Sequence, residues 1–234
     1  MQRYFGTKLV DNKFILNEDD LYHIKTVMRM KENDLIEVVY DKNEYICTLD
    51  DEYNALIKEK LAKKEINDKF ITLIVPLLKE QKFDLILQKA TELGVSSIIP
   101  VKMERSIVKL DNKDINKKIE RWSKICKEAS EQSKRVDIPE ISKIHSLNEL
   151  KDMPGLNIIC STSEKSLNIK NFLQHTKNCD RINVVVGPEG GISPKEEELL
   201  VSLGFTRVSL GNRIMRVETV PLYILSIFNY EFME

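Results

Sequence analysis

Two stretches near the carboxyl end carry the residues best suited to binding a ligand and doing chemistry on it. The first is the loop Gly187-Pro188-Glu189-Gly190-Gly191, whose three glycines let backbone amides approach a ligand closely. It follows the β-branched run 182–186 and precedes Ser193, Pro194 and Glu196, which predict a capped helix start. A strand that passes into a helix through glycines is typical of cofactor sites, although such a loop can also serve only as a turn.

The glycine loop does not match the common phosphate-binding signatures. A P-loop ends in Gly-Lys-Ser/Thr, and the dinucleotide fingerprint has three spaced glycines. Glu189 would also repel a phosphate. A carboxylate beside backbone amides instead suits a ligand with an amine, hydroxyl groups or a positive charge.

The second stretch, Leu210–Thr219, lies between a predicted strand and the last predicted helix. Its charged residues include Arg216 and Glu218, and ligands of open α/β folds bind at this carboxyl edge of the sheet. The alternative is that these two residues only cap the final helix. Ser161-Thr162-Ser163-Glu164 follows another predicted strand, and it either lines the same cleft or caps the next helix.

The segment 102–135 is basic, although the whole chain has a formal net charge of -1. It holds eleven Lys or Arg residues against six Asp or Glu residues, an excess of +5. Such an excess could follow a phosphate backbone, or it could be a solvated helix face. The segment ends in the polar cluster 128–135, which ordinary solvation of a surface does not require.

The elements that would position these stretches fall into two parts. Residues 1–68 contain extended runs at 34–40, 44–49 and 54–58, which predict a small barrel-like module. A helix is predicted over 18–30, with Leu21, Ile24, Val27 and Met28 along one stripe, and polar residues 63–68 predict a linker. Strands are then predicted at 70–76, 95–101, 156–161, 182–186 and 206–210, and helices at 79–93, 114–134, 166–176, 194–203 and 217–231. This alternation predicts a parallel α/β sheet.

Composition excludes several classes of protein. The chain has 234 residues, of which 42% are hydrophobic and 31% charged, as in soluble globular proteins. It shows neither an apolar run that could span a bilayer nor a signal peptide, so a cytoplasmic location and no membrane partner are expected. Four cysteines without a CxxC pair and three distant histidines predict no metal site, disulfide framework or catalytic triad: Cys47, Cys126, Cys160, Cys179, His23, His145 and His175.

Taken together, these stretches resemble the RsmE family of small-subunit ribosomal RNA uridine N3-methyltransferases, within the SPOUT class of S-adenosylmethionine-dependent enzymes. The matching motifs occur in order along nearly the whole chain: Arg3-Tyr4-Phe5, 89–94, Arg121-Trp122, 128–135, 186–191 and 210–219. The last two motifs, at their mutual spacing, are the most specific. Met215 stands where leucine is usual, Val220 where alanine is usual, and Asn33-Asp34 where glycine commonly precedes a polar residue. None of these departures removes a polar group that the chemistry needs.

The resemblance implies a PUA-like RNA-binding β-barrel over residues 1–68 and an α/β methyltransferase domain over 69–234 whose chain ends in a deep trefoil knot. It also implies a homodimer in which one subunit completes the cofactor pocket of the other. S-adenosylmethionine would be held mainly by the backbone of three loops, with Ile214 and Met215 as apolar walls. The implied cofactor-binding residues are Ser161, Thr162, Ser163, Glu164, Val186, Gly187, Pro188, Glu189, Gly190, Gly191, Leu210, Gly211, Arg213, Ile214, Met215, Arg216 and Thr219.

The implied reaction is methylation of N3 of a specific uridine in 16S ribosomal RNA, in the decoding region of the small ribosomal subunit. Uracil N3 must lose its proton before it attacks a methyl group, so the site must favour the anion. Arg216 is expected to stabilise negative charge on the uracil carbonyls, and Glu218 to accept the proton or orient Arg216. Residues expected to hold RNA are Arg3, Arg105, Gln132 and Arg135.

Two other functions remain open for the same residues. One is that of a related knotted methyltransferase acting on transfer RNA or on a ribose 2'-hydroxyl. The other is that of a catalytically silent RNA-binding protein that serves assembly. The presence of Arg216, Glu218 and Thr219 together disfavours the silent protein.

Overall fold

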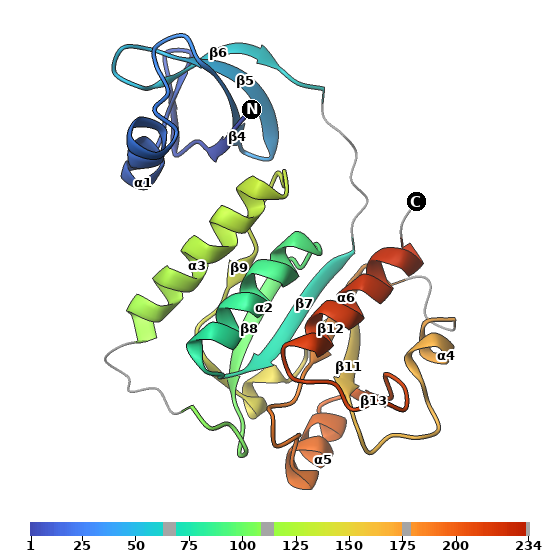
Figure 1. Ribbon diagram of the computed structural model, residues 1–234. Coiled ribbons are helices and arrows are strands. Elements are labelled where there is room, and N and C mark those ends of the chain that lie inside the picture. The colour runs from blue at the N-terminus through green and yellow to red at the C-terminus, as the bar shows by residue number, and fades with distance from the viewer. Residues whose placement is uncertain (63–68, 109–114, 175–178, 233–234) are drawn as a thin grey trace. The chain divides into compact units, whose positions relative to one another are not determined.

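The computed structural model describes residues 1–62, 69–108, 115–174 and 179–232 (Figure 1). The chain divides into two compact units. The first consists of Met1–Ile66 and Ser130–Ile138, and the second of Asn67–Ala129 and Pro139–Glu234. The predicted linker 63–68, and with it the boundary predicted after residue 68, lies outside the described residues. The grouping of Ser130–Ile138 with the amino-terminal unit is a feature that the sequence did not indicate.

The first unit is built on a six-stranded sheet in the order β1-β4-β5-β6-β3-β2. Its strands are β1 (Arg3–Phe5), β2 (Lys8–Val10), β3 (Lys13–Ile15), β4 (Leu35–Tyr40), β5 (Asn43–Leu49) and β6 (Ala55–Lys60). The pair β1–β4 is parallel and the other pairs are antiparallel. After β1 the chain hydrogen-bonds to both ends of this order, since Gly6 N donates to Val39 O and Thr7 N donates to Ile15 O. The sheet therefore curls into the predicted barrel-type module, around a core that includes Tyr4, Phe14, Ile36 and Val38.

The helical segment of this unit is shorter and less regular than predicted. It begins as α1 (Glu18–Tyr22) and continues as a π-helical turn, η1 (His23–Val27). Ile24 is buried as predicted, but Val27 is 57% exposed and Met28 is 39% exposed. Their predicted place on one buried stripe is wrong because a π-turn holds more residues than an α-turn and rotates the following side chains away.

The second unit contains an all-parallel sheet in the order β10-β8-β7-β12-β11-β13, with β9 also paired to β8. Its strands are β7 (Phe70–Pro76), β8 (Ser97–Lys102), β9 (Glu140–Ile141), β10 (His145–Ser146), β11 (Leu156–Cys160), β12 (Arg181–Val185) and β13 (Thr206–Val208). The strands β12, β11 and β13 are neighbours, so their carboxyl ends lie side by side at one edge of the sheet.

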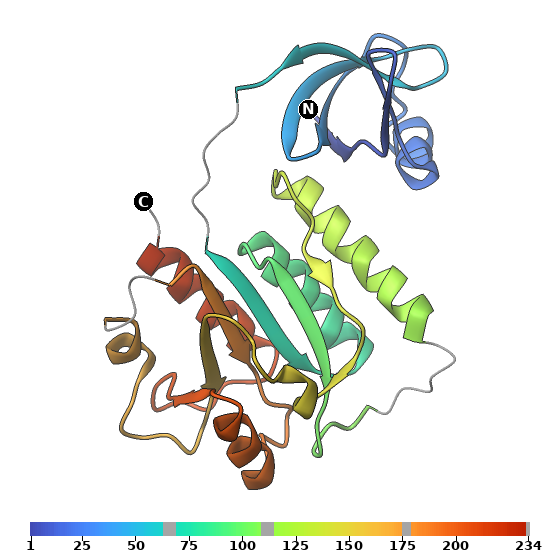
Figure 2. The same ribbon diagram turned by 180° about the vertical axis from the view of Figure 1, so that it is seen from behind.

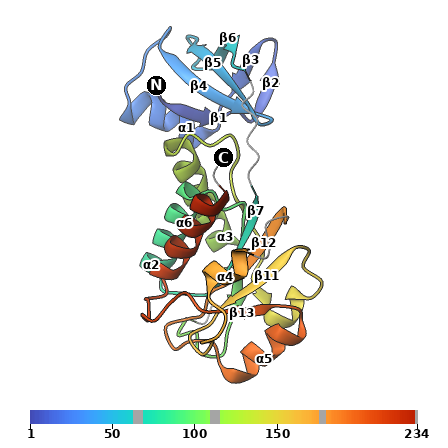
Figure 3. The same cartoon turned by 90° about the vertical axis from the view of Figure 1, so that its right-hand side faces the viewer.

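Helices cover both faces of this sheet. They are α2 (Glu80–Glu92), α3 (Ile115–Gln132), α4 (Ile169–Gln174), α5 (Pro194–Ser202), α6 (Thr219–Phe232) and the 3-10 turn η3 (Leu147–Leu150). Figure 3 shows α2 and α6 together on one side of the strands, where Leu73 and Val184 pack against Phe83 and Phe228. The opposite face is seen in Figure 2; there the next residues along the strands pack against η3 and α5, as Ile74, Val185, Leu147, Leu150 and Leu200 show.

The alternating strands and helices predicted from residue 70 onward are confirmed. The short strands β1, β2, β3, β9 and β10 were not predicted, whereas β13, which also has three residues, was. Within the described ranges, no helix combines the length and the apolar character that crossing a membrane requires.

Candidate cofactor and RNA site

The three loops predicted to hold a cofactor follow three neighbouring strands. Residues 161–164 follow β11, 187–191 follow β12 and 210–219 follow β13. Backbone hydrogen bonds join the segments that flank the first and third loops, because Ser209 N donates to Leu167 O at 2.8 Å and Ile169 N donates to Ser209 O at 2.9 Å. The structure therefore brings the predicted loops together at the carboxyl edge of the sheet, where open α/β folds bind ligands.

The glycine loop is a tight turn that requires its glycines. Gly191 N donates to Pro188 O at 2.8 Å, and Gly191 has a φ of +73°, in the left-handed region that favours glycine. A Cβ on Gly187 would lie 2.8 Å from Ile192 Cγ1. A residue outside the loop also binds it, since Arg105 Nη1 donates a hydrogen bond to Gly190 O at 2.9 Å. Arg105, predicted to hold RNA, thus lies beside the glycine loop.

A lysine that the sequence did not single out joins the glycine loop to the third loop. Lys82 Nζ on α2 lies 2.9 Å from Glu189 Oε1 and 3.6 Å from Glu218 Oε2. Lys82 donates a hydrogen bond to Glu189, and this bond raises the pKa of Lys82. Partial burial raises the pKa of Glu189, but the hydrogen bond and charge of Lys82 outweigh it, so the net pKa is lowered. One ammonium thus faces two carboxylates, and this cluster suits a cationic ligand.

Glu218 and Arg216 lie where α6 begins. The carbonyl oxygen of Arg216 accepts from Thr219 N at 2.9 Å and from Val220 N at 3.2 Å, so its backbone starts the helix while its side chain is exposed. Glu218 Oε2 is buried and has no hydrogen-bond partner among the described residues. Arg213 and Ile214 are also exposed, and Ile214 is 87% exposed. The backbone of Arg216 thus caps α6, as the capping alternative proposed, but its exposed side chain takes no part in the cap.

The first loop is organised by hydrogen bonds of Glu164 with the chain that follows it and of Ser161 to α5. Glu164 Oε1 accepts hydrogen bonds from Ser166 Oγ, Ser166 N and Leu167 N at 2.6 to 3.0 Å, and these bonds lower the pKa of Glu164 to about 2. Ser161 is 5% exposed, and its Oγ donates to Glu197 Oε1 at 2.7 Å. Glu164 thus fixes a turn ahead of α4 (Ile169–Gln174) and does not cap that helix, since Asn171 N donates to Asn168 Oδ1 at 2.9 Å. That the loop lines a cofactor cleft stays a prediction.

Arg3 has a structural role that the sequence did not predict. Its side chain is 5% exposed and pairs with the carboxylates of Glu37, at 3.0 Å, and Glu44. Its Nη1 donates to the carbonyl oxygens of Lys134, at 2.6 Å, and Arg135, at 3.0 Å. These bonds tie the β1–β4–β5 sheet to the segment Ser130–Ile138 within the first unit, and the proposed contact of Arg3 with RNA stays a prediction.

The other residues predicted to hold RNA differ in exposure. Gln132 is exposed at the last position of α3. The side chain of Arg135 is only 13% exposed, and its Nη2 lies 3.0 Å from Asp137 Oδ1. Part of the basic segment, 109–114, lies outside the described residues.

Sequence reasoning missed Lys82, Glu197 and Arg207. Lys82 could have been found, because it lies shortly after a predicted strand, at the same sheet edge as the loops. Glu197 lies in the run Glu196–Glu198, which reads as a solvated helix face. In the described part of the chain, no group of three or more His, Cys, Asp or Glu residues could hold a metal ion, and His175 lies outside that part.

Comparison with known proteins gives the same assignment for both units. Residues 65–229 match the family described as the RNA methyltransferase domain, and residues 16–54 match the RNA methyltransferase PUA domain. The chain is 35% identical to ribosomal RNA small subunit methyltransferase E of Bacillus subtilis, covering 99% of this chain and 97% of that protein. It is 33% identical to the protein of the same name from Mesomycoplasma hyopneumoniae, with 97% and 98% covered.

Solved structures agree along nearly the whole length. Ribosomal RNA small subunit methyltransferase E of Neisseria gonorrhoeae, bound to S-adenosylmethionine, superposes with a TM-score of 0.82 at 29% identity and covers 98% of this chain and 97% of its own. A methyltransferase of Legionella pneumophila, also with bound S-adenosylmethionine, gives a TM-score of 0.88 at 25% identity, with 97% and 96% covered. Because the methyltransferase match spans more than half of the chain and relatives above 30% identity span nearly all of it, the chain belongs to the ribosomal RNA small subunit methyltransferase E family of RNA methyltransferases.

Proposed function

We propose that this protein transfers the methyl group of S-adenosylmethionine to N3 of a uridine in 16S ribosomal RNA of the small ribosomal subunit. The observation that carries the proposal is the meeting of three loops at the carboxyl ends of β12, β11 and β13, with Arg216 and Glu218 in the third loop. The proposal also rests on relatives that match nearly the whole chain. One of them was solved with bound S-adenosylmethionine, and they are named ribosomal RNA small subunit methyltransferase E.

The residues of the three loops suit this cofactor. S-adenosylmethionine is a cation at its sulfonium and its amine, and Glu189 and Glu218 face one lysine, which leaves an excess of negative charge. Gly211 has a φ of +117°, and a Cβ there would meet nothing within 4 Å, so the third loop presents bare backbone to open space. We therefore assign the cofactor to the backbone of the loops 161–164, 186–191 and 210–219, with Ile214 and Met215 as apolar walls.

The chain's own residues must then make uracil N3 nucleophilic. When bound, the cofactor supplies an electrophilic methyl group, and the protein has to stabilise the anion left when the N3 proton departs. The exposed guanidinium of Arg216 is a permanent cation and is proposed to neutralise charge on the uracil carbonyl oxygens. Glu218 Oε2 is buried and faces Lys82, so Glu218 is better placed to fix the loop and its cation than to meet solvent, and its role as proton acceptor stays a proposal.

The proposal is tested by methylation of defined RNA substrates. The protein is incubated with methyl-labelled S-adenosylmethionine and, separately, with small ribosomal subunits, naked 16S RNA and transfer RNA, and the labelled nucleotide is mapped. We expect N3-methyluridine in 16S RNA. Label in transfer RNA or at a ribose 2'-hydroxyl would favour the related methyltransferase, and no label with retained RNA binding would favour the silent assembly protein.

The role of Arg216 is tested by substitution. Arg216→Met is expected to lower kcat by roughly 100-fold or more, since removing one group that stabilises a developing anion costs about that much. Binding of S-adenosylmethionine, measured by calorimetry, should change far less than kcat. Arg181→Met is the matched control because Arg181 lies at the opposite, amino end of the sheet, over the ring of Phe70. A parallel loss of cofactor binding in Arg216→Met would show that Arg216 acts on the cofactor and not on uracil.

RNA is proposed to contact Arg105, Gln132 and Arg135, with Arg3 as a further predicted contact. These positions would supply orientation and not sequence reading, because arginines that meet phosphates carry no base information. Arg135→Ala should weaken RNA affinity and reduce its dependence on salt while leaving cofactor binding unchanged. Unchanged RNA affinity would exclude Arg135 from the RNA surface.

We also propose that two copies form the active enzyme and that the chain end is knotted, as the family resemblance implies. The exposed apolar side chains at and near α6, including Ile214, Tyr223 and Tyr230, are the surface that a second copy would cover. Light scattering of the purified protein should give twice the mass of 27.2 kDa. An experimental structure traced through residues 156–232 tests the knot. A ribosomal substrate also implies a cytoplasmic location.

A further inference from the structure

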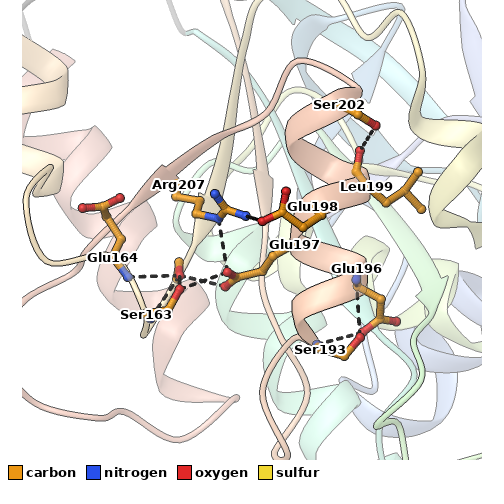
Figure 4. A network of polar contacts seen from close by, with 10 residues as sticks. Ser163, Glu164, Ser193, Glu196, Glu197, Glu198, Leu199, Ser202 and Arg207 are labelled. Carbon is orange, nitrogen blue, oxygen red and sulfur yellow. Dashed lines mark hydrogen bonds and ion pairs between the residues drawn. The ribbon is translucent and has the colours of Figure 1, made fainter.

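Glu197 is a buried carboxylate outside the three cofactor loops, and the proposed reaction does not use it. It lies on α5, is 9% exposed, and accepts hydrogen bonds at both oxygens. Its Oε1 accepts from Ser161 Oγ at 2.7 Å, and its Oε2 accepts from Ser163 Oγ at 3.0 Å and from Arg207 Nε at 3.2 Å. Figure 4 shows the carboxylate between Ser163 and Arg207.

These contacts fix the backbone of the first loop. Because the Ser161 hydroxyl gives its proton to Glu197, its oxygen lone pairs point to the loop, and it accepts from Ser163 N at 3.1 Å and from Glu164 N at 3.3 Å. The Ser163 hydroxyl donates to Glu197 Oε2, and its oxygen lies 2.8 Å from Ser161 Oγ. The conformation of residues 161–164 therefore depends on an acceptor that the loop itself does not contain.

Glu197 also connects the other two loops. The helix that carries it begins at Pro194, three residues after the glycine loop ends, and it is fixed there by the capping box of Ser193 and Glu196. Arg207, its cationic partner, is on β13, three residues before Leu210, where the third loop starts. One carboxylate thus joins the elements that lead into or out of all three loops.

We infer that Glu197 is a positioning residue for S-adenosylmethionine: it holds the loop 161–164 in register with the glycine loop and the third loop, and it does not touch the cofactor. This inference rests on the proposed cofactor role of these loops. A glutamine at this position fills the same volume but offers one acceptor oxygen and a donor NH2, where three donors converge. The NH2 would repel Arg207 Nε, and a serine could meet it only as an acceptor. Ser161 would then give the NH2 a lone pair that now accepts from Ser163 N or Glu164 N, and the loop amides lose their fixed acceptor.

The test is the binding of S-adenosylmethionine to Glu197→Gln by calorimetry, which separates stoichiometry from affinity. We expect Kd to rise on the order of tenfold with an unchanged stoichiometry, because the protein stays folded but its loop is no longer preorganised. In turnover, KM for the cofactor should rise in parallel, while kcat at saturating cofactor and KM for RNA stay within about twofold of wild type. A residue that only stabilised the fold would lower stoichiometry and leave Kd unchanged, and that result would overturn the inference.

The neighbouring glutamate supplies a matched control. Glu198 binds the same arginine, at 2.8 Å from Arg207 Nη2, but it is exposed and does not reach the loop. Glu198→Gln should leave Kd unchanged, whereas Arg207→Gln, which reaches the loop only through Glu197, should raise Kd in the same direction as Glu197→Gln. If Glu197→Gln does not fold, Arg207→Gln decides the question, and an unchanged Kd there would overturn the inference. Failure of the wild-type protein to bind S-adenosylmethionine would instead refute the proposed function.

Discussion

Arg3 offers the sharpest test of how the amino-terminal unit is held together. We predict that Arg3→Met destabilises the sheet of that unit and exposes it to solvent. The guanidinium meets two carboxylates, those of Glu37 and Glu44, and two carbonyl oxygens, those of Lys134 and Arg135, with its side chain only 5% exposed. Methionine fills much of the volume but donates to none of them.

The expected magnitude follows from these contacts. Removing one partner of a buried ion pair costs about 3–5 kcal/mol, because the other partner remains buried and charged. Glu37 keeps a second cation, since Lys134 Nζ lies 2.8 Å away, and the carboxylates are 19% and 17% exposed. The lower end of the range, about 3 kcal/mol, is therefore expected, which corresponds to amide exchange roughly 100-fold faster. The loss of stability in Arg3→Lys should lie between zero and that of Arg3→Met, because an ammonium keeps the charge but cannot reach all four acceptors as the forked guanidinium does.

Hydrogen exchange followed by mass spectrometry measures this effect region by region. Peptides from β1, β4 and β5 should exchange faster in Arg3→Met, whereas peptides from β7 and β12 should not change. Lys13→Met is the control, because its single pair with Asp50 spans 3.4 Å at 31% exposure and is worth less than about 1 kcal/mol. Exchange in β1, β4 and β5 close to that of wild type would refute the reasoning, and a loss of RNA affinity in the same variant would then assign Arg3 to the RNA surface.

Three further predictions follow from other contacts. Burial raises the pKa of Glu37, but the hydrogen bonds and charges of Lys134 and Arg3 outweigh this effect, so the net pKa is lowered. Wild type should therefore be more stable than Glu37→Gln above the usual pKa of 4.5, and this difference should vanish as the pH falls below the lowered pKa. Thermal unfolding between pH 7 and pH 3 measures it. Lys82→Met should lower kcat, because Lys82 pairs with carboxylates of two loops, those of Glu189 and Glu218. Lys89→Met is the control, since it removes only a pair with Glu92 at 2.8 Å on the same helix and should leave kcat unchanged. Equal rates in both variants would refute this prediction. Gly155→Ala should cost roughly 1–3 kcal/mol in urea unfolding, because Gly155 has a φ of +99° and its Cβ would lie 2.3 Å from Arg181 O; an unchanged midpoint would contradict it.

The sequence predicted the second unit well because its signals are local. Runs such as Ile182–Val186 are long enough to be recognised as buried strands, and alternation with helices fixes a parallel sheet. The carboxyl edge of that sheet then places the three loops together without further information. The first unit was predicted less completely, since β1, β2 and β3 have only three residues each, too few to show a period of two.

The roles of Arg3 and Glu197 could not be predicted, because both depend on residues far away along the chain. Arg3 reads as an exposed cation near an end, and its partners lie 34 to 132 residues away. Glu197 reads as one of three consecutive glutamates on a solvated helix, and only the fold brings Ser161 to it, 36 residues away. Buried charges of this kind are invisible to periodicity, since burial of a charge is decided by its partners.

The inclusion of Ser130–Ile138 in the amino-terminal unit has a consequence for the order of events during synthesis. The two carbonyl oxygens that accept from Arg3 belong to Lys134 and Arg135, which are synthesised 131 and 132 residues after it, so the contacts of Arg3 are incomplete until that segment has left the ribosome. A fragment that stops at residue 66 would carry the buried arginine with its carboxylates and without those oxygens. The amino-terminal unit can therefore complete its native contacts only after residues 130–138 are synthesised. The elements between 70 and 129 emerge before that segment and can begin to fold first.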